Sequence, residues 1–293
     1  MLFDAVAKRG PVCVGLDTSP ACLPPERGRY GSDADAAAAF NRVIIDATRD
    51  IAACYKVQIA CYEALGIDGL RCYSKTLAYL REQKLLVIAD IKRGDIADTA
   101  KQYAAAHFSG DFEADFVTLS PYMGMDSIEP WLEWAVSRGK GAFVLMRTSN
   151  RGMRDFEYLE LAPKPEEDSR RVYDAVGEKL AALAASHCGT RGYGAFGAVV
   201  GVNPSPYERE EAARLRARFD GLFFLVPGYG AQGGTALDAA MLLREGNGGV
   251  VNASRSILTA WKKEDNADFE RAALAARKAA EEMRGALQQA VKN

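Results

Sequence analysis

Eight short apolar runs alternate along this chain with alanine-rich stretches of helical periodicity, and this alternation constrains the fold more than any other feature. The apolar runs are rich in β-branched residues, which favours β-strands. They lie at 11–17, 54–60, 85–92, 114–120, 141–149, 194–203, 222–228 and 248–254. The helical stretches lie at 33–53, 67–83, 96–108, 126–138, 172–187, 206–219, 235–244 and 268–291. Strands that alternate with helices in this way form parallel βαβ units.

The number of these units predicts the α/β class and a single (β/α)8 TIM barrel domain over residues 1–293. Such a barrel commonly uses about 250 residues, so a chain of 293 residues can hold one together with an insertion. A doubly wound sheet is the alternative, although that fold more often has about five to seven strands. The charged stretch 150–171 is a long insertion after the fifth strand, and it is either a lid or an elaboration at the edge.

The composition excludes several classes of function. Lys and Arg total 37 against 39 Asp and Glu, a formal charge of −2 that gives no electrostatic support for binding nucleic acid or a membrane surface. No apolar run approaches the ~18 residues of a membrane span, and the first residues lack the apolar segment of a signal peptide. The two histidines, His107 and His187, are far apart, so we expect no histidine-based metal site. None of the six cysteines forms CxxC, which indicates reduced thiols and a cytoplasmic protein.

Charged residues at the end of the third strand are the strongest indication of chemistry. Asp90 and Lys92 are two residues apart, so on a strand they point to the same face. With Lys56 on the second strand and Asp95 just beyond the third, they predict a cluster of two lysines and two aspartates. A structural ion pair is the alternative reading, because buried charges must be paired. Flanking carboxylates favour a protonated Lys92, which suits a proton donor rather than a Schiff-base nucleophile.

A glycine-rich segment follows the seventh strand. The residues GYGAQG at 228–233 match GxGxxG, a pattern found in dinucleotide sites. Here the pattern lies on the seventh strand, and the next strand ends in Arg255 rather than in an acid that would hold a ribose. Barrels often bind phosphate after strands 7 and 8, so a phosphate monoester held by Gln232 and Arg255 is the preferred reading. A plain tight turn is the alternative, and the loop 228–234 is also a candidate lid.

Several motifs taken together resemble the orotidine 5′-phosphate decarboxylase family. These are DIKRGDI with a following DT, the lysine of the second strand, PGYGAQGG and NASRSI, in that order. TSNRG, LSPYMG and the insertion 150–171 are similar to the longer subgroup of that family. The family converts orotidine monophosphate to UMP and CO2 without a metal or an organic cofactor. The resemblance therefore implies a pyrimidine nucleoside monophosphate as substrate and a homodimer with shared active sites.

The resemblance also assigns expected roles to individual residues. Lys92 would protonate C6 of the pyrimidine, Asp90 would lie against the departing carboxylate, and Lys56 would complete the charged network. Asp95 would be contributed across the dimer interface, together with Ile96 and Thr99. The remaining expected substrate contacts are the ribose through Asp17 and Lys56, the pyrimidine through Ser149 (with Ser120 as a competing candidate), and the phosphate through Gln232 and Arg255. Pro227 is a further expected substrate-binding residue.

Two other functions compete with the decarboxylase. The first is a metal-dependent sugar-phosphate decarboxylase or hexulose-phosphate synthase of the same suprafamily, which needs a magnesium-binding Glu before the motif. Glu63 comes too late in the second strand to supply it. The second is a catalytically silent ligand-binding barrel, which the charge cluster disfavours because a binding protein has no need to bury lysines and aspartates.

Overall fold

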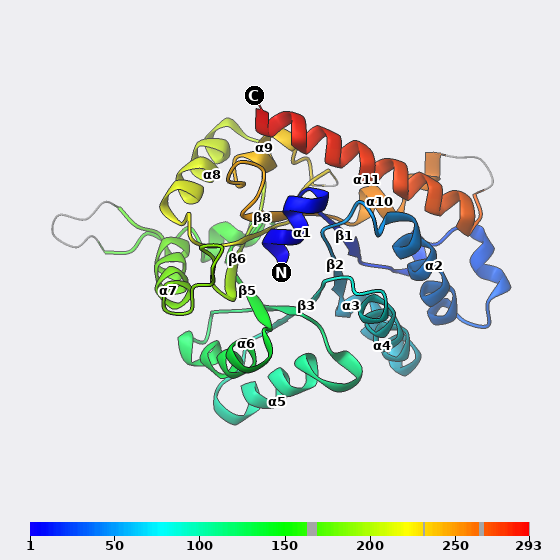
Figure 1. Ribbon diagram of the computed structural model, residues 1–293, viewed down its shortest axis with the longest axis horizontal. Coiled ribbons are helices and arrows are strands. Elements are labelled where there is room, and N and C mark those ends of the chain that lie inside the picture. Colours follow the sequence, from blue (N-terminus) through cyan, green and yellow to red (C-terminus); the bar gives the residue numbers. More distant parts are fainter. Residues whose placement is uncertain (163–168, 231, 264–266, 293) are drawn as a thin grey trace.

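The eight strands of the computed structural model close into a parallel barrel in chain order (Figure 1). The structure describes residues 1–162, 169–230, 232–263 and 267–292. The strands are β1 (Val12–Leu16), β2 (Cys54–Gln58), β3 (Val87–Arg93), β4 (Phe116–Leu119), β5 (Gly141–Arg147), β6 (Phe196–Val200), β7 (Phe224–Val226) and β8 (Gly249–Ala253). β8 pairs in parallel with β1, so the predicted (β/α)8 barrel is confirmed and the open doubly wound sheet is not formed.

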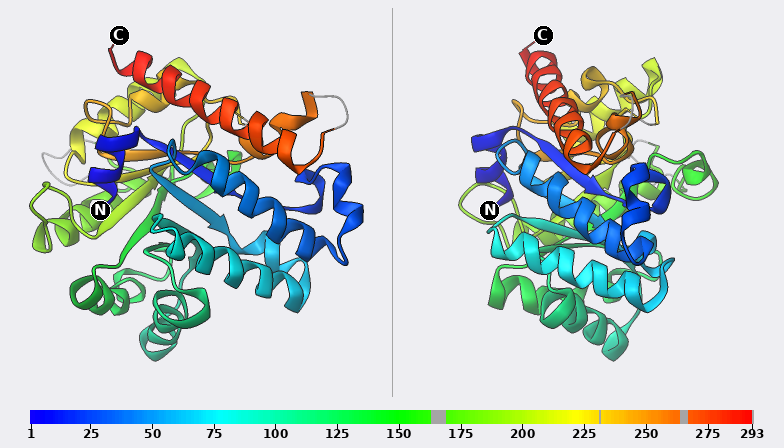
Figure 2. Two further views of the ribbon diagram at one scale, coloured as in Figure 1. Left: turned by 45° about the vertical axis from the view of Figure 1, so that its right-hand side comes forward. Right: turned by 90° about the vertical axis from the view of Figure 1, so that its right-hand side faces the viewer.

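Helices cover the outside of this barrel, as the alternating pattern predicts. They are α2 (Asp33–Thr48), α3 (Ile59–Glu63), α4 (Gly66–Glu82), α5 (Ala97–Phe108), α6 (Leu132–Arg138), α7 (Val172–Ser186), α8 (Pro206–Arg218), α9 (Ala236–Ala240), α10 (Arg255–Leu258) and α11 (Phe269–Lys292). In both views of Figure 2, α11 runs along the outside of the barrel beside α2. Among the described helices, none has the length and apolar character needed to cross a membrane.

Several boundaries differ from the sequence-based expectation, and two of them have a local cause. The second strand was expected to reach residue 60, but β2 ends at Gln58 and the chain turns into α3. The Gln58 side chain accepts a hydrogen bond from the Ala60 N–H at 3.3 Å and so caps that helix. The helix expected over 126–138 begins as 3-10 turns, because Pro130 has no N–H to donate, and α6 covers only its end.

A short helix at the start of the chain, α1 (Leu2–Arg9), closes the N-terminal end of the barrel. Its buried face packs Leu2 and Val6 against interior side chains such as Phe143 and Phe223. Figure 1 shows α1 in front of the strands, near the middle of the barrel. Gly10 ends this helix with a backbone φ of 87°, a left-handed conformation that favours glycine. The sequence patterns did not predict this helix. It covers the end of the barrel at which the strands begin.

Candidate active site

A cavity of about 590 Å³ lies at the C-terminal ends of the strands. Eight of the predicted site residues line it, together with several polar side chains that were not predicted. The predicted residues in the cavity wall are Asp17, Lys56, Asp90, Lys92, Ser149, Pro227, Gln232 and Arg255. The barrel therefore brings together residues from six strand ends that span most of the chain.

Four charged side chains form an alternating row across the mouth of the barrel. The Lys56 ammonium lies 3.0 Å from an Asp17 oxygen and 2.8 Å from Asp90 Oδ2. The other Asp90 oxygen, Oδ1, lies 2.6 Å from the Lys92 ammonium. Asp90 thus bridges two lysines, and every carboxylate in the row faces an ammonium group.

Burial distinguishes the two lysines. The Lys56 and Asp90 side chains are 6% and 7% exposed, whereas that of Lys92 is 47% exposed. Burial alone would lower the pKa of Lys56, but Asp90 and Asp17 outweigh it and raise that pKa. Burial would likewise raise the pKa of Asp90, but Lys56 and Lys92 hold it well below its usual range. Both buried groups are therefore ionised at neutral pH, and Lys92 extends from this fixed ion pair toward the cavity.

The backbone that carries Lys92 is irregular. The register between β3 and β4 shifts between Ala89 and Arg93, and Lys92 has a φ of 45°. Thr118 on β4 stabilises this bulge, because its hydroxyl oxygen accepts hydrogen bonds from the N–H groups of Ile91 and Lys92, both at 3.0 Å. The same hydroxyl donates to Asp90 Oδ1 at 2.8 Å. One buried side chain therefore sets the positions of both Asp90 and Lys92.

Sequence reasoning missed several residues of the cavity wall, among them this threonine, Gln58 and Lys262. Gln58 donates to Asp90 Oδ2 at 2.9 Å, and its position two residues after Lys56 could have revealed it through the strand period. Thr118 lies near the end of β4, so the alternation of side chains along that strand could have revealed it as well. Lys262 also lines the cavity, from the turn that follows α10. No strand pattern points to that lysine, because it is placed by the fold of a loop.

Three predicted residues do not line the cavity of this single chain. Asp95, Ile96 and Thr99 lie at the start of α5, beyond the bulge, and the side chains of Ile96 and Thr99 are exposed. Asp95 Oδ1 accepts a hydrogen bond from the Ile96 N–H at 2.8 Å. Within one chain, Asp17 takes the place in the charged row that the spacing had suggested for Asp95.

The loop after β5 presents Ser149 to the cavity, whereas the competing Ser120 packs against Gly94 outside it. This loop is held by the insertion expected to be a lid or an edge elaboration. Glu157 accepts hydrogen bonds from the backbone N–H of Thr148 at 2.8 Å and from its hydroxyl at 2.7 Å. The described part of the insertion therefore supports the cavity wall, and its residues 163–168 lie outside the described residues.

The glycine-rich loop after β7 has the backbone that its composition predicts. Gly228, Gly230 and Gly233 all have left-handed φ values, of 104°, 71° and 91°. The N–H groups of Gly230 and Gly233 donate to carbonyl groups of the loop itself, so they do not face a ligand. Side chains that can donate to a ligand line the cavity from this loop and from the end of β8, among them Gln232 and Arg255. Residue 231 of the candidate lid lies outside the described residues.

The metal-dependent alternative predicts a carboxylate on the second strand. Glu63 lies instead in α3, where it pairs with Arg93 at 3.5 Å, and it does not line the cavity. In the described part of the chain, no three His, Cys, Asp or Glu side chains form a group that could hold a metal ion.

Comparisons with known proteins connect this geometry to a family. A sequence model described as "Orotidine 5'-phosphate decarboxylase / HUMPS family" matches residues 10–268. A relative from Clostridium perfringens (strain SM101 / Type A), named orotidine 5′-phosphate decarboxylase, is 54% identical over 292 residues and covers 99% of this chain and 98% of its own. A relative of the same name from Clostridium acetobutylicum is 53% identical, with 91% of each chain covered.

Solved structures give the same result. The structure of Leishmania donovani OMP decarboxylase has a TM-score of 0.73 and 33% identity, and the match covers 97% of this chain and 98% of that chain. A structure titled as a putative orotidine-monophosphate-decarboxylase from Toxoplasma gondii has a TM-score of 0.77 and 30% identity, with 98% and 97% covered. The similarity thus extends over nearly the whole chain, including the insertion.

Proposed function

Because the chain belongs to the orotidine 5′-phosphate decarboxylase family, we propose how its cavity residues carry out the reaction of that family. The activity itself is the loss of CO2 from orotidine monophosphate, which gives UMP. Relatives with more than half of their residues identical over nearly the full length carry that name, so the metal-dependent alternative is not favoured. The roles below are supported by the alternating row of charges, with Lys92 extending from the ion pair of Asp90 and Lys56.

Breaking the bond between C6 and the carboxylate leaves an electron pair on C6. We assign the proton that replaces CO2 to the Lys92 ammonium, which Asp90 positions from 2.6 Å. A positive charge about 4 Å from a developing negative charge contributes about 4 kcal/mol at an effective dielectric constant near 20. The deprotonated Lys92 then regains its proton from solvent, and this route requires neither a metal nor an organic cofactor. Asp90 would lie next to the departing carboxylate and would raise the free energy of the bound substrate through charge repulsion.

The other end of the substrate supplies binding energy. Gln232 and Arg255 would bind the phosphate, because guanidinium and amide groups donate to phosphate oxygens. Asp17 would accept a hydrogen bond from a ribose hydroxyl group and Lys56 would donate one, Ser149 would contact the pyrimidine, and Pro227 would line the substrate cavity. Energy from the phosphate lowers the barrier only when it is realised in the transition state. Closure of the loop 228–234 over the substrate would achieve this, with Ala231 outside the described residues.

We also propose that the protein is a homodimer in which Asp95, Ile96 and Thr99 reach the site of the other chain. These residues lie next to the charged row in sequence but outside the cavity of their own chain. Large apolar side chains are exposed in the loops at the same end of the barrel, among them Tyr122, which is 84% exposed, and Phe156, which is 62% exposed. Their rings lie 6.4 Å apart and form an apolar surface suited to association.

The proton-donor assignment is tested with Lys92→Ala and a matched control, Lys101→Ala. Lys101 is an exposed lysine that pairs with Asp98 on α5. The loss of orotidine monophosphate is followed by ultraviolet absorbance in the presence of EDTA, and UMP binding is measured by calorimetry. We expect Lys92→Ala to abolish turnover but to bind UMP, and Lys101→Ala to behave as the wild type. Turnover of Lys92→Ala near the wild-type rate would refute the role, and loss of wild-type activity in EDTA would favour the metal-dependent alternative.

The shared site is tested by mixing two inactive variants, Asp95→Ala and Lys92→Ala. In a mixed dimer, one of the two sites has both residues intact, so each mixed dimer should regain about half the activity of a wild-type dimer. If subunit exchange is confirmed and no activity returns, Asp95 acts in the site of its own chain.

A cytoplasmic location is also proposed, on the basis of cysteine chemistry. All six cysteines are free thiols, and four of them are buried. Free thiols persist in a reducing compartment. Recovery of the protein in the cytoplasmic fraction of fractionated cells is the expected result, and recovery from the culture medium would contradict the proposal.

A further inference from the structure

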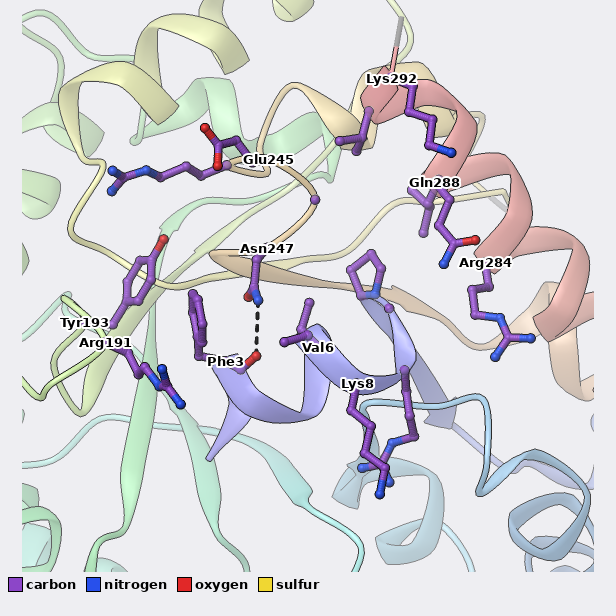
Figure 3. A pocket seen from close by; sticks show the side chains of 18 residues that line it. Phe3, Val6, Lys8, Arg191, Tyr193, Glu245, Asn247, Arg284, Gln288 and Lys292 are labelled. Atoms are coloured by element: carbon purple, nitrogen blue, oxygen red, sulfur yellow. Dashed lines mark hydrogen bonds between the residues drawn. The ribbon is translucent and has the colours of Figure 1, made fainter.

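A second cavity, of about 970 Å³, lies at the opposite end of the barrel from the active site (Figure 3). Its wall is formed by α1, the last turns of α11 and the segments that precede β1, β6 and β8. Figure 3 shows Arg284, Gln288 and Lys292 on one side, along α11, with Arg191 and Tyr193 across from them. Because these segments precede the strands, a ligand bound here would not compete with the decarboxylase substrate.

The lining of this cavity is strongly positive, whereas the whole chain has a formal charge of −2. Six cationic side chains line it, and they are Lys8, Arg9, Arg191, Arg244, Arg284 and Lys292. Glu245 is the acidic residue of the described lining. The whole chain has 37 basic and 39 acidic residues, so positive charge is concentrated at this one place. Such concentration favours an anionic ligand.

Several of these cations have no anionic partner. Arg191 pairs with Asp4 at 2.8 Å, and Arg244 lies 3.9 Å from Asp220. Within the described ranges, Lys8, Arg284 and Lys292 form no ion pair at contact distance, although Arg284 interacts electrostatically with Asp50. The Nη2 group of Arg9 donates to the carbonyl oxygen of Ala53 at 3.3 Å, and its buried Nε has no hydrogen-bond partner in the described part of the chain. The cavity thus keeps an excess of positive charge that its own structure does not neutralise.

Helix ends explain only part of this arrangement. Lys8 and Lys292 lie in the last turns of α1 and α11, where cations interact favourably with the helix dipole. Arg284 lies two turns before the end of α11, and Arg191 and Arg244 belong to loops. The dipole gives no reason for these three guanidinium groups to line the same cavity as the helix ends.

We propose that this cavity is a binding site for a small polyanion with two or more linked phosphate groups. Arginine donates to phosphate oxygens in a forked geometry, and lysine adds charge. After Glu245, Asp4, Asp220 and Asp50 are set against the six cations, the remaining positive charge suits a polyphosphate chain better than a single anion. Phe3 and Tyr193 line the same cavity, so the ligand is either a free polyphosphate or the polyphosphate part of a nucleotide whose base lies on these rings.

Calorimetric titration of the whole protein tests the site, with UMP present at saturation to occupy the active site. The two probes are inorganic tripolyphosphate and ATP. The test variant is Arg284→Gln, and the matched control is Lys278→Gln, which removes one exposed charge from the same helix outside the cavity. We expect the Kd to rise at least about tenfold in Arg284→Gln, since a charge-assisted hydrogen bond is lost. The Kd of Lys278→Gln should stay within about twofold of wild type.

The outcomes separate the two ligand sources. Equal affinity for both probes identifies the polyphosphate chain as the ligand chemistry, and tighter binding of ATP shows that the nucleoside contributes. Decarboxylase activity should be unchanged in Arg284→Gln, which shows that the variant is folded. The proposal is overturned if neither probe binds in the presence of UMP, or if both variants bind as tightly as the wild type. A charge reversal, Arg284→Glu, gives an independent check, because it should abolish binding of both probes.

Discussion

Thr118 offers the sharpest test of how the active site is held together. Its side chain is 2% exposed, and its hydroxyl oxygen is the acceptor for the N–H groups of Ile91 and Lys92. Thr118→Val has nearly the same shape but removes that oxygen, so two buried N–H groups lose their acceptor and Asp90 loses a donor. Thr118→Ser is the matched control, because it keeps the hydroxyl and removes only a methyl group.

The magnitude follows from these contacts. A buried donor left without a partner costs about 1–3 kcal/mol, so two of them give about 2–6 kcal/mol. Local relaxation reduces that range, and we expect the free energy of unfolding to fall by about 2–4 kcal/mol. The bulge that positions Lys92 also loses the two hydrogen bonds that hold it in place. Misplacement of a reacting group by about 1 Å lowers a rate by as much as about 100-fold, so kcat should fall about 10- to 100-fold.

Two measurements check this expectation. Denaturant unfolding gives the loss of stability. The ultraviolet decarboxylation assay gives kcat and KM under conditions in which the variant is folded. The drop should appear mainly in kcat, because the residues assigned to the phosphate lie in the segments that follow β7 and β8, away from the bulge. A Thr118→Val variant with the unfolding free energy and kcat of Thr118→Ser would show that the hydroxyl does not position Asp90 and Lys92.

Three further predictions concern other parts of the molecule. Burial lowers the pKa of His107 from 6.5 to about 4, so the stability that its neutral form contributes is present above pH 6.5 and is lost as the pH falls toward 4. The loss is about 3 kcal/mol, and it should disappear in His107→Gln but persist in His187→Gln, as followed by urea unfolding at several pH values. Glu157→Ala removes both hydrogen bonds to Thr148, so unfolding should need about 1–3 kcal/mol less and KM should rise; unchanged values would show that the insertion does not support the cavity wall. Arg255→Ala should weaken UMP binding about 10- to 100-fold and leave uridine binding unchanged, and an equal loss for both ligands by calorimetry would place the arginine away from the phosphate.

Local sequence patterns were sufficient for the barrel and for much of its active site. The alternation of apolar runs and helical stretches predicts eight strands, and all eight form. The strand period places Asp90 and Lys92 on one face, and their ion pair is present even though the backbone bulges between them. These inferences succeed because the directions of side chains along a strand, and the end of a barrel that carries the site, follow from local geometry.

Contacts between distant segments could not be predicted in the same way. Thr118 meets Asp90 only because β4 pairs with β3 in the register that sets Val117 opposite Ala89, and Glu157 reaches Thr148 only because the insertion folds back onto the loop after β5. No periodicity in the sequence encodes either contact.

The cationic cavity at the other end of the barrel has the same origin. Its lysines and arginines come from α1, from α11 and from two loops, and in the sequence they are ordinary surface residues separated by most of the chain. Closure of the barrel brings β8 beside β1, and with it the two ends of the chain. Hydrophobic periodicity therefore specifies which elements form, whereas the packing of those elements decides which charges meet.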